Sequence, residues 1–573
     1  MNSFAFAVRT KTKALLDAAG LLPAARRVAA LIAAPPAYRR YERRVRQFGR
    51  EHAEILREPL SSGAQEQRIA LVCSPSFPEA HIQLGMVKAL QLANFVPVVL
   101  LTDTGRDGRL LAELYRLAGV DEIHEIAEFR AAADDTLADE VIGHCKSMWD
   151  LLEFERAGIR VGRLAVSSAL RSTYRGSLDL QSPKDRKFLL DCLAHSIACA
   201  DAAQQIVRKF RPAVAMFVDT VYCPTGELFD CCIQAKVDVI QWQQSHKSNT
   251  LLFKRYSQKN LWDHPNSLSE QSWRVVREMD WSDSHRQELD RDLYSTYASG
   301  DWYSVAGTQF DTSIVESKQV LRERLQLDPS KKTAFIFPHI LWDATLFWGE
   351  CLFRNFEEWF IATVREACAN DRVNWVIKIH PANRRLREAW SLRSEPAEIV
   401  ALNKYIGKLP AHIHMVPPES EISTYSLFPI MDYCLTVCGT VGVEAARLGV
   451  PVVTGGRGYY DNRGFTVDSK TREEYLEKLR TIERIPPLSP SQRELAERFA
   501  YVNFLMRPWR ASSVTLRYLP HSKKFLSQAE VNIRAKDDWR AAEDIRALAE
   551  WLQDPAKPEE YLAKLSQACS LTR

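Results

Sequence analysis

Residues 432–458 read DYCLTVCGTVGVEAARLGVPVVTGGRG, and this stretch decides the fold of the chain. It predicts a short apolar strand, a turn at 438–440, a helix that carries Glu444, and a second apolar strand at 450–454. A helix that joins two strands in this way is the unit of a parallel sheet. The turn gathers backbone N–H groups at the positive end of a helix dipole, which suits an anionic ligand such as a nucleotide phosphate. An ordinary crossover with a glycine cap would give the same pattern.

Strands and helices alternate in the same way through two long parts of the chain. The first part covers 69–242 and the second covers 333–454, with a polar and mostly helical stretch between them. Each part predicts a doubly wound parallel sheet, whose ligand crevice lies beyond the carboxyl ends of the strands. We therefore expect an α/β protein of two Rossmann-like domains with a cleft between them. The expected boundaries are a basic helical N-terminal extension at 1–66, a first domain at 67–320, a second domain at 321–485 and a helical C-terminal tail at 486–573.

The composition is that of a folded protein with more than one core. The chain has 573 residues, which is too long for a single core, and 46% of them are apolar while 26% are charged. No run approaches the roughly 18 apolar residues that span a bilayer. The net charge of +4 is too small to indicate nucleic-acid binding.

The cysteines and the missing motifs exclude several classes of protein. The twelve cysteines form no CxxC pair and fall mostly in apolar segments, so we expect reduced core residues. Cys434 and Cys438 are spaced like half a metal site, but nothing completes it, and we expect no metal. Neither GxGxxG nor a P-loop occurs, which weakens dehydrogenase and kinase interpretations. No secretory signal is evident at the start, so a cytoplasmic location is expected.

The N-terminal extension is rich in Lys and Arg and has helical periodicity, with helices expected at 12–22, 24–34 and 38–56. A basic helical arm with an apolar face suits an anionic membrane surface. A solvated extension that packs on the following domain would have the same composition. Further along, we expect helical structure at 134–155, a polar segment at 167–176 and one long helix at 184–210.

The tetrapeptide 378–381, Lys-Ile-His-Pro, closes a strand that is expected to be buried. Pro381 stops the strand where the side chains of Lys378 and His380 would emerge at its carboxyl edge. Both side chains can donate hydrogen bonds to a phosphate, and an imidazole can assist departure of a phosphate leaving group. A second His-Pro pair, His264-Pro265, lies in a polar loop, and we expect it to be a plain turn.

Carboxylates near the expected cleft supply candidates for acid–base chemistry. Asp219 ends a strand, and Glu227 lies in the first turn of a helix, so either is a candidate for the base that deprotonates an acceptor hydroxyl. One carboxylate suffices for inversion at a sugar carbon, whereas a nucleophilic carboxylate would give retention. Helix capping is the alternative for both. Glu444 is placed to accept hydrogen bonds from ribose hydroxyls or, alternatively, to pair with Arg447.

The first strand of the second domain is followed by His339 and Asp343, which are expected to face the cleft. Aromatic side chains in the same loop could stack on a base or a sugar, or belong to the core; they are Trp342, Phe347 and Trp348.

Residues 378–381 together with 437–456 resemble the paired motifs of bacterial capsule polysaccharide biosynthesis glycosyltransferases, the group that includes Kdo transferases and sialyltransferases. The resemblance covers 333–503 best. It implies a GT-B fold in which His380 touches the donor phosphate, Gly439 and Thr440 hold phosphate or ribose, and Glu444 holds the nucleoside. Gly439-Thr440 stands where sialyltransferase-like members have a Ser-Ser pair, which leaves the donor open. The loop 458–466 also resembles the family, and implies donor or acceptor contacts for Tyr460 or Asn462.

The resemblance implies a metal-independent glycosyltransferase that needs no cofactor. Its donor would be a nucleotide-sugar, for example a CMP-sugar that carries Kdo or another acidic sugar, and its acceptor a lipid-linked glycan or a capsule or other surface polysaccharide. It would work in the cytoplasm, either free or as a peripheral protein of the inner membrane. The alternatives are a nucleotide-sugar 2-epimerase of the same fold and a non-catalytic capsule assembly or glycan-binding factor.

Overall fold

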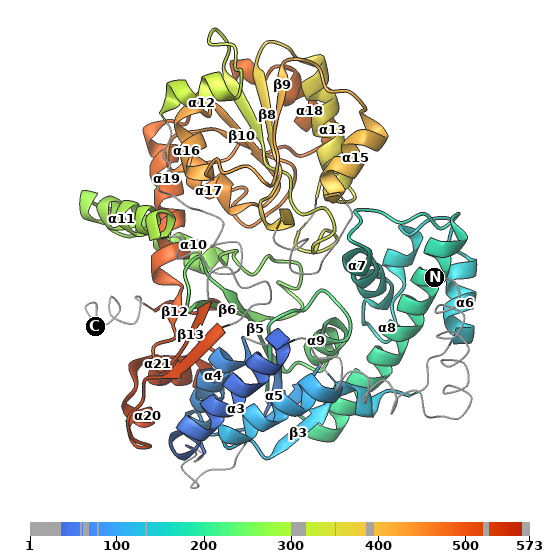
Figure 1. Ribbon diagram of the computed structural model, residues 1–573, viewed down its shortest axis with the longest axis vertical. Coiled ribbons are helices and arrows are strands. Elements are labelled where there is room, and N and C mark those ends of the chain that lie inside the picture. Colours follow the sequence, from blue (N-terminus) through green and yellow to red (C-terminus); the bar gives the residue numbers. More distant parts are fainter. Residues whose placement is uncertain are drawn as a thin grey trace.

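The computed structural model describes residues 36–57, 60, 68–76, 79–102, 104–131, 135–299, 317–349, 351–384, 395–518 and 527–563. The chain forms two lobes, each built around a sheet of mostly or wholly parallel strands with helices on its faces (Figure 1). This is the predicted α/β architecture of two Rossmann-like domains, arranged as in the GT-B fold.

The first sheet has the strand order β12-β6-β5-β4-β1-β2-β3. Its five parallel strands are β1 (Arg68–Cys73), β2 (Phe95–Leu101), β3 (Glu122–Glu125), β4 (Val214–Phe217) and β5 (Asp238–Gln244). Strand β6 (Thr250–Tyr256) is antiparallel to β5, and β12 (Trp509–Arg510) is antiparallel to β6. The central strands are apolar along their length because helices cover both faces of the sheet.

The helices of this lobe are α4 (Ala80–Leu92), α5 (Gly105–Leu117), α6 (Asp135–Gly143), α7 (Val161–Thr173), α8 (Pro183–Phe210) and α9 (Thr225–Gln234), with 3₁₀ turns at Ile126–Phe129 and Asp150–Glu153. The long helix α8 begins where predicted, because Ser182 caps it by accepting from the amide of Asp185 and Pro183 occupies its first position.

Two predictions in this lobe need correction. The stretch 134–155 is only partly helical, as α6 and a 3₁₀ turn. The segment 167–176, described from the sequence only as polar, belongs for the most part to the helix α7. Its buried residues Val161, Leu164, Ala165 and Ala169 follow helical spacing, which the serines among them concealed.

The second sheet is fully parallel, with the order β11-β10-β7-β8-β9. Its strands are β7 (Thr333–Ile336), β8 (Asn374–Lys378), β9 (Ile413–Val416), β10 (Tyr433–Thr436) and β11 (Val452–Thr454). Its helices are α13 (Phe356–Ala369), α15 (Ala397–Tyr405), α16 (Thr424–Leu427), α17 (Thr440–Ala446) and α18 (Arg472–Arg480), with 3₁₀ turns at Phe428–Ile430 and Ile482–Arg484. The stretch 432–458 therefore forms β10, α17 and β11, as predicted.

The chain crosses between the lobes twice. After β6 it runs through α10 (Glu270–Glu278), α11 (Asp283–Ser299) and α12 (Lys318–Arg324) to β7. It returns through α19 (Pro490–Tyr501) and a π-helical turn (Val502–Met506) to β12. Helix α19 packs against α10, α11 and α17, so both crossings run side by side.

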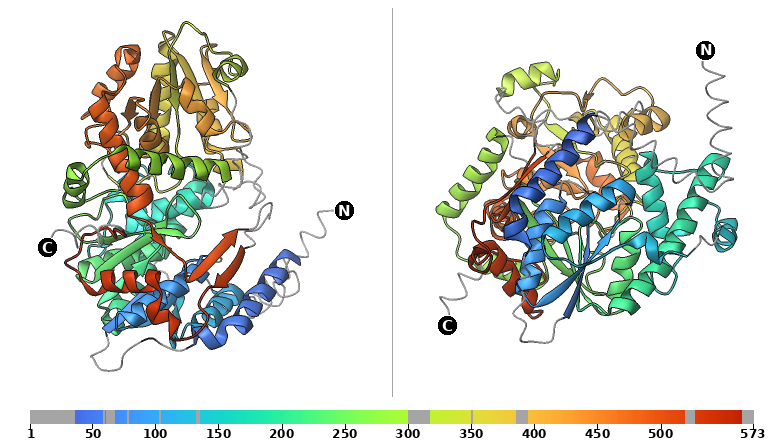
Figure 2. Two further views of the ribbon diagram at one scale, coloured as in Figure 1. Left: turned by 90° about the vertical axis from the view of Figure 1, so that its left-hand side faces the viewer. Right: turned by 60° about the horizontal axis from the view of Figure 1, so that its bottom comes forward.

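The C-terminal tail is not wholly helical, contrary to the prediction. After β12, the strands β13 (Val514–Tyr518) and β14 (Ser527–Val531) form an antiparallel pair, followed by α20 (Asp538–Ala541) and α21 (Glu543–Gln553). The tail returns to the first lobe, where α21 packs on α4 (Figure 2). The strand pattern is visible in Val514 and Leu516, two buried residues that alternate with polar ones.

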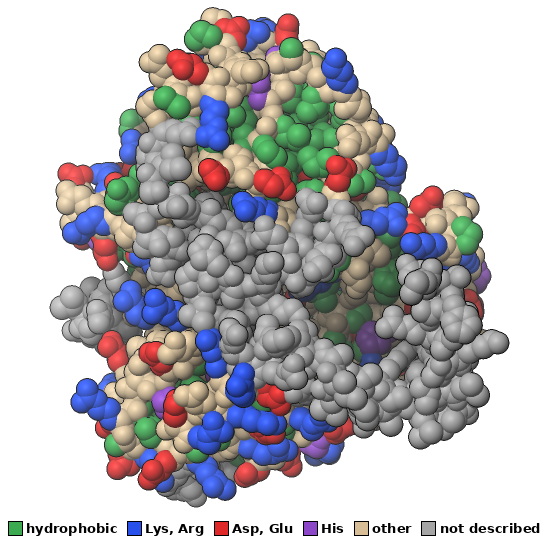
Figure 3. All heavy atoms as spheres, in the orientation of Figure 1, with side chains coloured by type: hydrophobic (Ala, Val, Ile, Leu, Met, Phe, Trp, Pro, Cys, Tyr) green, Lys and Arg blue, Asp and Glu red, His purple; other side chains and the backbone are tan. Residues whose placement is uncertain are grey.

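Helix α3 (Pro36–Leu56) confirms the last helix of the predicted N-terminal extension, whereas 12–22 and 24–34 lie outside the described residues. It packs on α5 and β14 through the buried side chains of Val45, Phe48 and Leu56. Basic side chains are prominent on the surface of this lobe (Figure 3), and Arg43, Arg46 and Arg50 of α3 are among the exposed ones. Within the described part of the chain, no helix combines the length and the apolar character that a membrane crossing needs.

Candidate active site between the two sheets

A cavity of about 670 Å³ lies where the carboxyl ends of the two parallel sheets face each other. One wall comes from the loops after β4 and β5, and the opposite wall from the loops after β7, β8 and β10. Ligands of open α/β sheets bind at this edge, and the volume is that of a small-molecule site. Nine of the predicted site residues line the cavity: Asp219, His339, Asp343, Lys378, His380, Pro381, Gly439, Thr440 and Glu444.

Asp219 follows β4, and its side chain is 40% exposed. The guanidinium of Arg171, on α7, donates to its Oδ2 at 2.8 Å, and the same guanidinium lies 4.2 Å from the ring centre of Tyr222. The ion pair fixes the direction of the Asp219 carboxylate and leaves it reachable from the cavity. The sequence prediction missed Arg171 because it described 167–176 only as a polar segment and did not recognise the helix α7.

Glu227, the other candidate base, does not line the cavity. It is fully buried on the inner face of α9. Its Oε1 accepts from the hydroxyl of Ser196 at 2.5 Å and from the thiol of Cys223 at 2.8 Å. Burial raises the pKa of Glu227 to about 7. The first-turn position suggested an outward-facing carboxylate, but the helix presents this side of its first turn to the interior.

Tyr222 and Asp343 connect the two lobes across the cavity. The hydroxyl of Tyr222 donates to Asp343 Oδ1 at 2.6 Å and accepts from the amide of Ala344 at 2.8 Å. A second contact across the lobes runs from Arg163 Nη1 to the carbonyl of Leu346 at 2.9 Å. Asp343 therefore faces the cleft as predicted, and its position depends on a residue of the opposite lobe.

His339 lies inside the turn after β10. Its Nε2 accepts from the amides of Cys438 at 3.1 Å and Val437 at 3.3 Å, so its proton is on Nδ1. The ring stacks on Phe356 with 4.4 Å between ring centres. Burial and the proximity of His380 lower the pKa of His339 to about 3. The amide of Cys438, in the turn proposed for phosphate binding, is thus already bonded to an imidazole.

Lys378 and His380 emerge at the carboxyl end of β8, as predicted. Lys378 Nζ donates to the carbonyl of Ile422 at 3.3 Å, and burial lowers the pKa of Lys378 to about 8. The Nδ1 of His380 accepts from the amide of Ala382 at 3.1 Å, so Nε2 carries the proton and is a donor. The enclosing protein and the Lys378 ammonium lower the pKa of His380 to about 4, although solvent in the cavity reaches the ring.

Glu444 lines the cavity from α17 but is almost fully buried. It accepts a hydrogen bond from the hydroxyl of Tyr297, on α11. Burial raises the pKa of Glu444 to about 7. Arg447 is not its hydrogen-bond partner, because the Arg447 guanidinium donates to Asp290 at 2.5 Å.

Tyr460 and Asn462 do not line the cavity. The buried hydroxyl of Tyr460 donates to the carbonyl of Gly439 at 2.8 Å and thereby supports the turn from below. A Cβ at Gly442 would lie 2.2 Å from this hydroxyl, so the helix needs glycine there. Asn462 is exposed, and its backbone N–H donates to Asp468 while its side-chain amide donates to Asp461.

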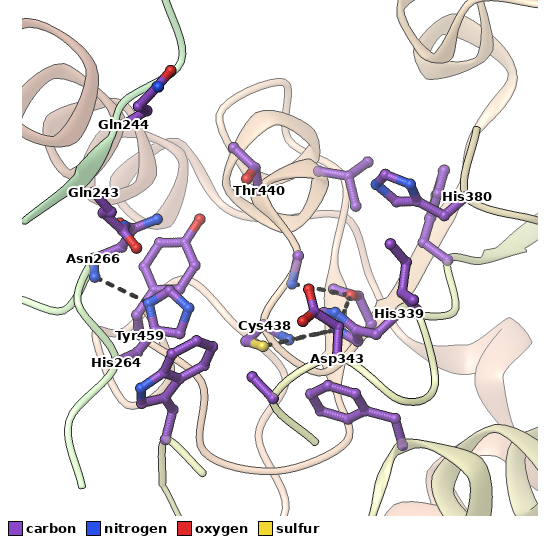
Figure 4. Close-up of a pocket in the computed structure, with 18 of the residues that line it drawn as sticks. Gln243, Gln244, His264, Asn266, His339, Asp343, His380, Cys438, Thr440 and Tyr459 are labelled. Carbon is purple, nitrogen blue, oxygen red and sulfur yellow. Dashed lines mark hydrogen bonds between the residues drawn. The ribbon is translucent and has the colours of Figure 1, made fainter. Parts of the chain in front are cut away.

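The loop at 264–266 is the main part of the cavity that sequence reasoning missed. His264, predicted to be a plain turn, stacks on Tyr459 at 4.8 Å between ring centres and lies 4.8 Å from Trp348. Gln243, at the end of β5, donates to Asn266. Figure 4 shows these amides and rings at one end of the cavity and His380 at the other. In the sequence, only the aromatic and amide residues of the loops that carry these side chains could have indicated their role.

In the described part of the chain, no group of three or more His, Cys, Asp or Glu side chains is placed to hold a metal ion. Eleven cysteines of this part have free thiols. The residues of the cavity instead offer hydrogen-bond donors, carboxylates and aromatic faces.

No protein-family profile and no curated protein sequence matches the chain. Solved structures that match include two forms of KpsC from Thermosulfurimonas dismutans. The beta Kdo 2,4 transferase has a TM-score of 0.31 and 14% identity over 55% of this chain and 84% of that chain. The beta Kdo 2,7 transferase has a TM-score of 0.29 and 15% identity over 57% of this chain and 86% of that chain.

A UDP-GlcNAc 2-epimerase from Neisseria meningitidis, bound to UDP-GlcNAc, matches with a TM-score of 0.23 and 12% identity over 76% of this chain and 97% of that chain. Matches at these identities and TM-scores carry no argument about activity, which has to come from the cavity itself.

Proposed function

We propose that the protein is a glycosyltransferase that moves a sugar from a nucleotide-sugar donor to a glycan acceptor. The observation that carries the proposal is the arrangement of the cavity. Lys378 and the Nε2–H of His380 lie on one wall, and the carboxylate of Asp219 comes from the opposite sheet. The first two groups suit a departing phosphate, and the third suits an acceptor hydroxyl.

The phosphate wall supports the proposal through charge and hydrogen bonding. Among the described residues that line the wall formed by the second lobe, Lys378 is the one Lys or Arg. A neutral imidazole with its proton on Nε2 can donate to a phosphate oxygen without first gaining a proton. Negative charge that develops on the leaving nucleotide is thus stabilised by one ammonium and one preformed donor.

Asp219 is the base in this proposal. It lies at the end of β4, it is accessible, and Arg171 holds its direction. A carboxylate that accepts the proton of an acceptor hydroxyl increases the nucleophilicity of the oxygen as it attacks the sugar carbon. Glu444, hydrogen-bonded to Tyr297, is placed to accept from ribose hydroxyls when it is ionised. We propose a CMP-sugar with an acidic sugar as the first donor to test, and a capsule or other surface polysaccharide as the acceptor.

The experiment is to incubate the purified protein with CMP-, UDP- and GDP-sugars and to measure donor hydrolysis by nucleotide release. We expect one donor class to be hydrolysed, and His380→Ala to lower the rate about 100-fold because a donor to the leaving phosphate is lost. His144→Ala is the matched control, since His144 is exposed and far from the lining of the cavity.

Three outcomes would contradict the proposal. Equal hydrolysis by His380→Ala and wild type would remove the phosphate role of this imidazole. Conversion of the sugar nucleotide into its 2-epimer without any acceptor would identify an epimerase. Failure to bind every nucleotide tested would favour a non-catalytic glycan-binding factor.

A further inference from the structure

The end of the cavity away from His380 is built from uncharged hydrogen-bonding groups and aromatic rings. Gln243 and Asn266 contribute amides, and His264 and Tyr459 contribute rings (Figure 4). Trp348 also lines the cavity, with its ring 4.8 Å from that of His264. The His264 ring lies nearly parallel to Tyr459, at 24°, and at a steep angle to Trp348, at 71°. Two rings that meet at an angle form a corner into which a flat ligand fits along one face.

This corner is held in place by buried contacts. The guanidinium of Arg507 is fully buried and donates to the carbonyls of Pro265 at 2.8 Å and Asn266 at 2.7 Å. The amide of Asn266 donates to His264 Nδ1 at 3.0 Å, which leaves the proton of His264 on Nε2. The loop is therefore fixed before any ligand arrives, which lowers the entropy cost of binding.

The charges around the corner discriminate between kinds of ligand. Burial, together with nearby Lys254, lowers the pKa of His264 to about 3, so its imidazole is neutral. Along the carboxyl edge of the first sheet, the next groups after the amides of β5 are Asp219 after β4 and Glu79 after β1. Arg171, the one Arg or Lys that the described residues of this lobe contribute to the lining, is paired with Asp219. An anionic ligand would meet the carboxylates of Asp219 and Glu79 along this edge, while the guanidinium of Arg171 is engaged by Asp219 and that of Arg507 by backbone carbonyls.

We infer that this corner binds the acceptor of the transfer reaction and that the acceptor presents an uncharged, hydroxyl-rich sugar ring there. The inference rests on the proposed function. Amide groups exchange pairs of hydrogen bonds with neighbouring sugar hydroxyls, and aromatic rings pack on the C–H face of a pyranose. Along the edge of the sheet, the next carboxylate after this corner is that of Asp219, the proposed base.

The experiment measures saccharide binding separately from donor chemistry, by saturation-transfer NMR on the full chain. One set of probes is neutral: the methyl glycosides of glucose, galactose, mannose, N-acetylglucosamine and N-acetylgalactosamine. The other set is acidic: the methyl glycosides of glucuronic acid, N-acetylneuraminic acid and Kdo. We expect a neutral glycoside to bind, and the acidic set to bind at least about tenfold more weakly.

Variants test whether the glycoside that gives the NMR signal is bound at the corner. His264→Ala and Gln243→Ala should each weaken neutral binding about tenfold, since one removes a stacking face and the other an amide. His144→Ala, at an exposed position outside the lining of the cavity, should leave it unchanged. Gln244→Arg, which adds a cation at this edge, should shift the preference toward acidic glycosides. A thermal unfolding curve for each variant shows that it is folded.

The inference is overturned if acidic glycosides bind as well as neutral ones, if no neutral glycoside binds, or if both corner variants bind like wild type. These results are separable from the donor assay. Donor hydrolysis together with any of them refutes the corner and leaves the proposed function standing. Neutral binding at the corner without hydrolysis of any donor refutes the proposed function and leaves a saccharide-binding site.

Discussion

The molecule contains two His-Pro pairs that have the same local geometry and different surroundings. In both, Nδ1 of the imidazole accepts from the amide two residues further on, at 3.0 Å for His264 and 3.1 Å for His380. Both rings are neutral Nε2–H donors that line the same cavity. The local sequence therefore sets the tautomer of each histidine, whereas the role of each depends on what holds it and what lies beside it.

The two pairs differ in their supports. His380 follows β8, so the parallel sheet delivers it to the cavity, and Lys378 lies beside it. The loop of His264 has no such strand before it, and a guanidinium from a π-helical turn in the second crossing fixes it instead. A pattern of strand and proline can be recognised in a sequence. A tether from Arg507, which is 242 positions from Pro265, cannot be recognised there.

Breaking that tether should have the largest effect. Arg507→Met removes the donor for three backbone carbonyls, those of Pro265, Asn266 and Ser267. We expect the free energy of unfolding to fall by about 3 kcal/mol or more, because buried carbonyl groups lose their partner. Urea unfolding measures this change. Arg510→Met, at an exposed position three residues later, is the control and should change stability by less than about 0.5 kcal/mol.

The same variant sharpens the comparison between the two histidines. If Arg507 fixes only the His264 side of the cavity, donor hydrolysis by folded Arg507→Met should persist while saccharide binding is lost. Loss of donor hydrolysis with intact saccharide binding would reverse the assignment of the two walls.

A middle-sized effect distinguishes a hydrogen-bond donor from an acid at His380. Because the neutral ring acts through its Nε2–H, the amide of glutamine can replace it in part. We expect His380→Gln to hydrolyse the donor about tenfold faster than His380→Ala. Steady-state rates at pH 7 are the measurement, and equal rates for the two variants would mean that the imidazole must itself transfer a proton.

The smallest effect concerns the ammonium of Lys378, which lies beside His380 in the lining of the cavity. Burial lowers the pKa of Lys378 to about 8, so its ammonium is charged at pH 7 and loses its proton as the pH rises through 8. Donor affinity should therefore fall by up to about tenfold between pH 7 and pH 9. Calorimetric titration with the hydrolysed nucleotide tests this. Lys378→Arg keeps its charge over this range and should show a flat profile; a wild-type profile without a fall would contradict the role.

The sequence predicts the sheets well because their strands are continuous apolar runs that depend little on distant partners. Strand β6 is harder to predict, since Lys254 and Arg255 are buried in it only because Glu560 and Asp238 compensate their charges. Helix α7 was also missed, because serines such as Ser167 made a partly buried helix look like a polar segment. Local composition fails where a residue is buried by something far away in the chain.

For the site, the ends of strands could be predicted and the orientations of side chains could not. Lys378, His380 and the turn at Gly439 follow strands, so they line the cavity as expected. Glu227 occupies an equally favourable place in the sequence, yet Ser196 and Cys223 hold it in the interior. The turn itself binds His339, a contact that requires the loop after β7 to approach β10.

The two crossings of the chain have a consequence for how the cavity admits its ligands. Two domains joined by one connection can rotate about it in any direction, whereas two domains joined by two adjacent connections are restricted to a hinge motion about the line through both. The two crossings join the lobes of this protein along one side, so the lobes can open and close as about a hinge. A single protease cut in either crossing would leave the lobes connected by the other one.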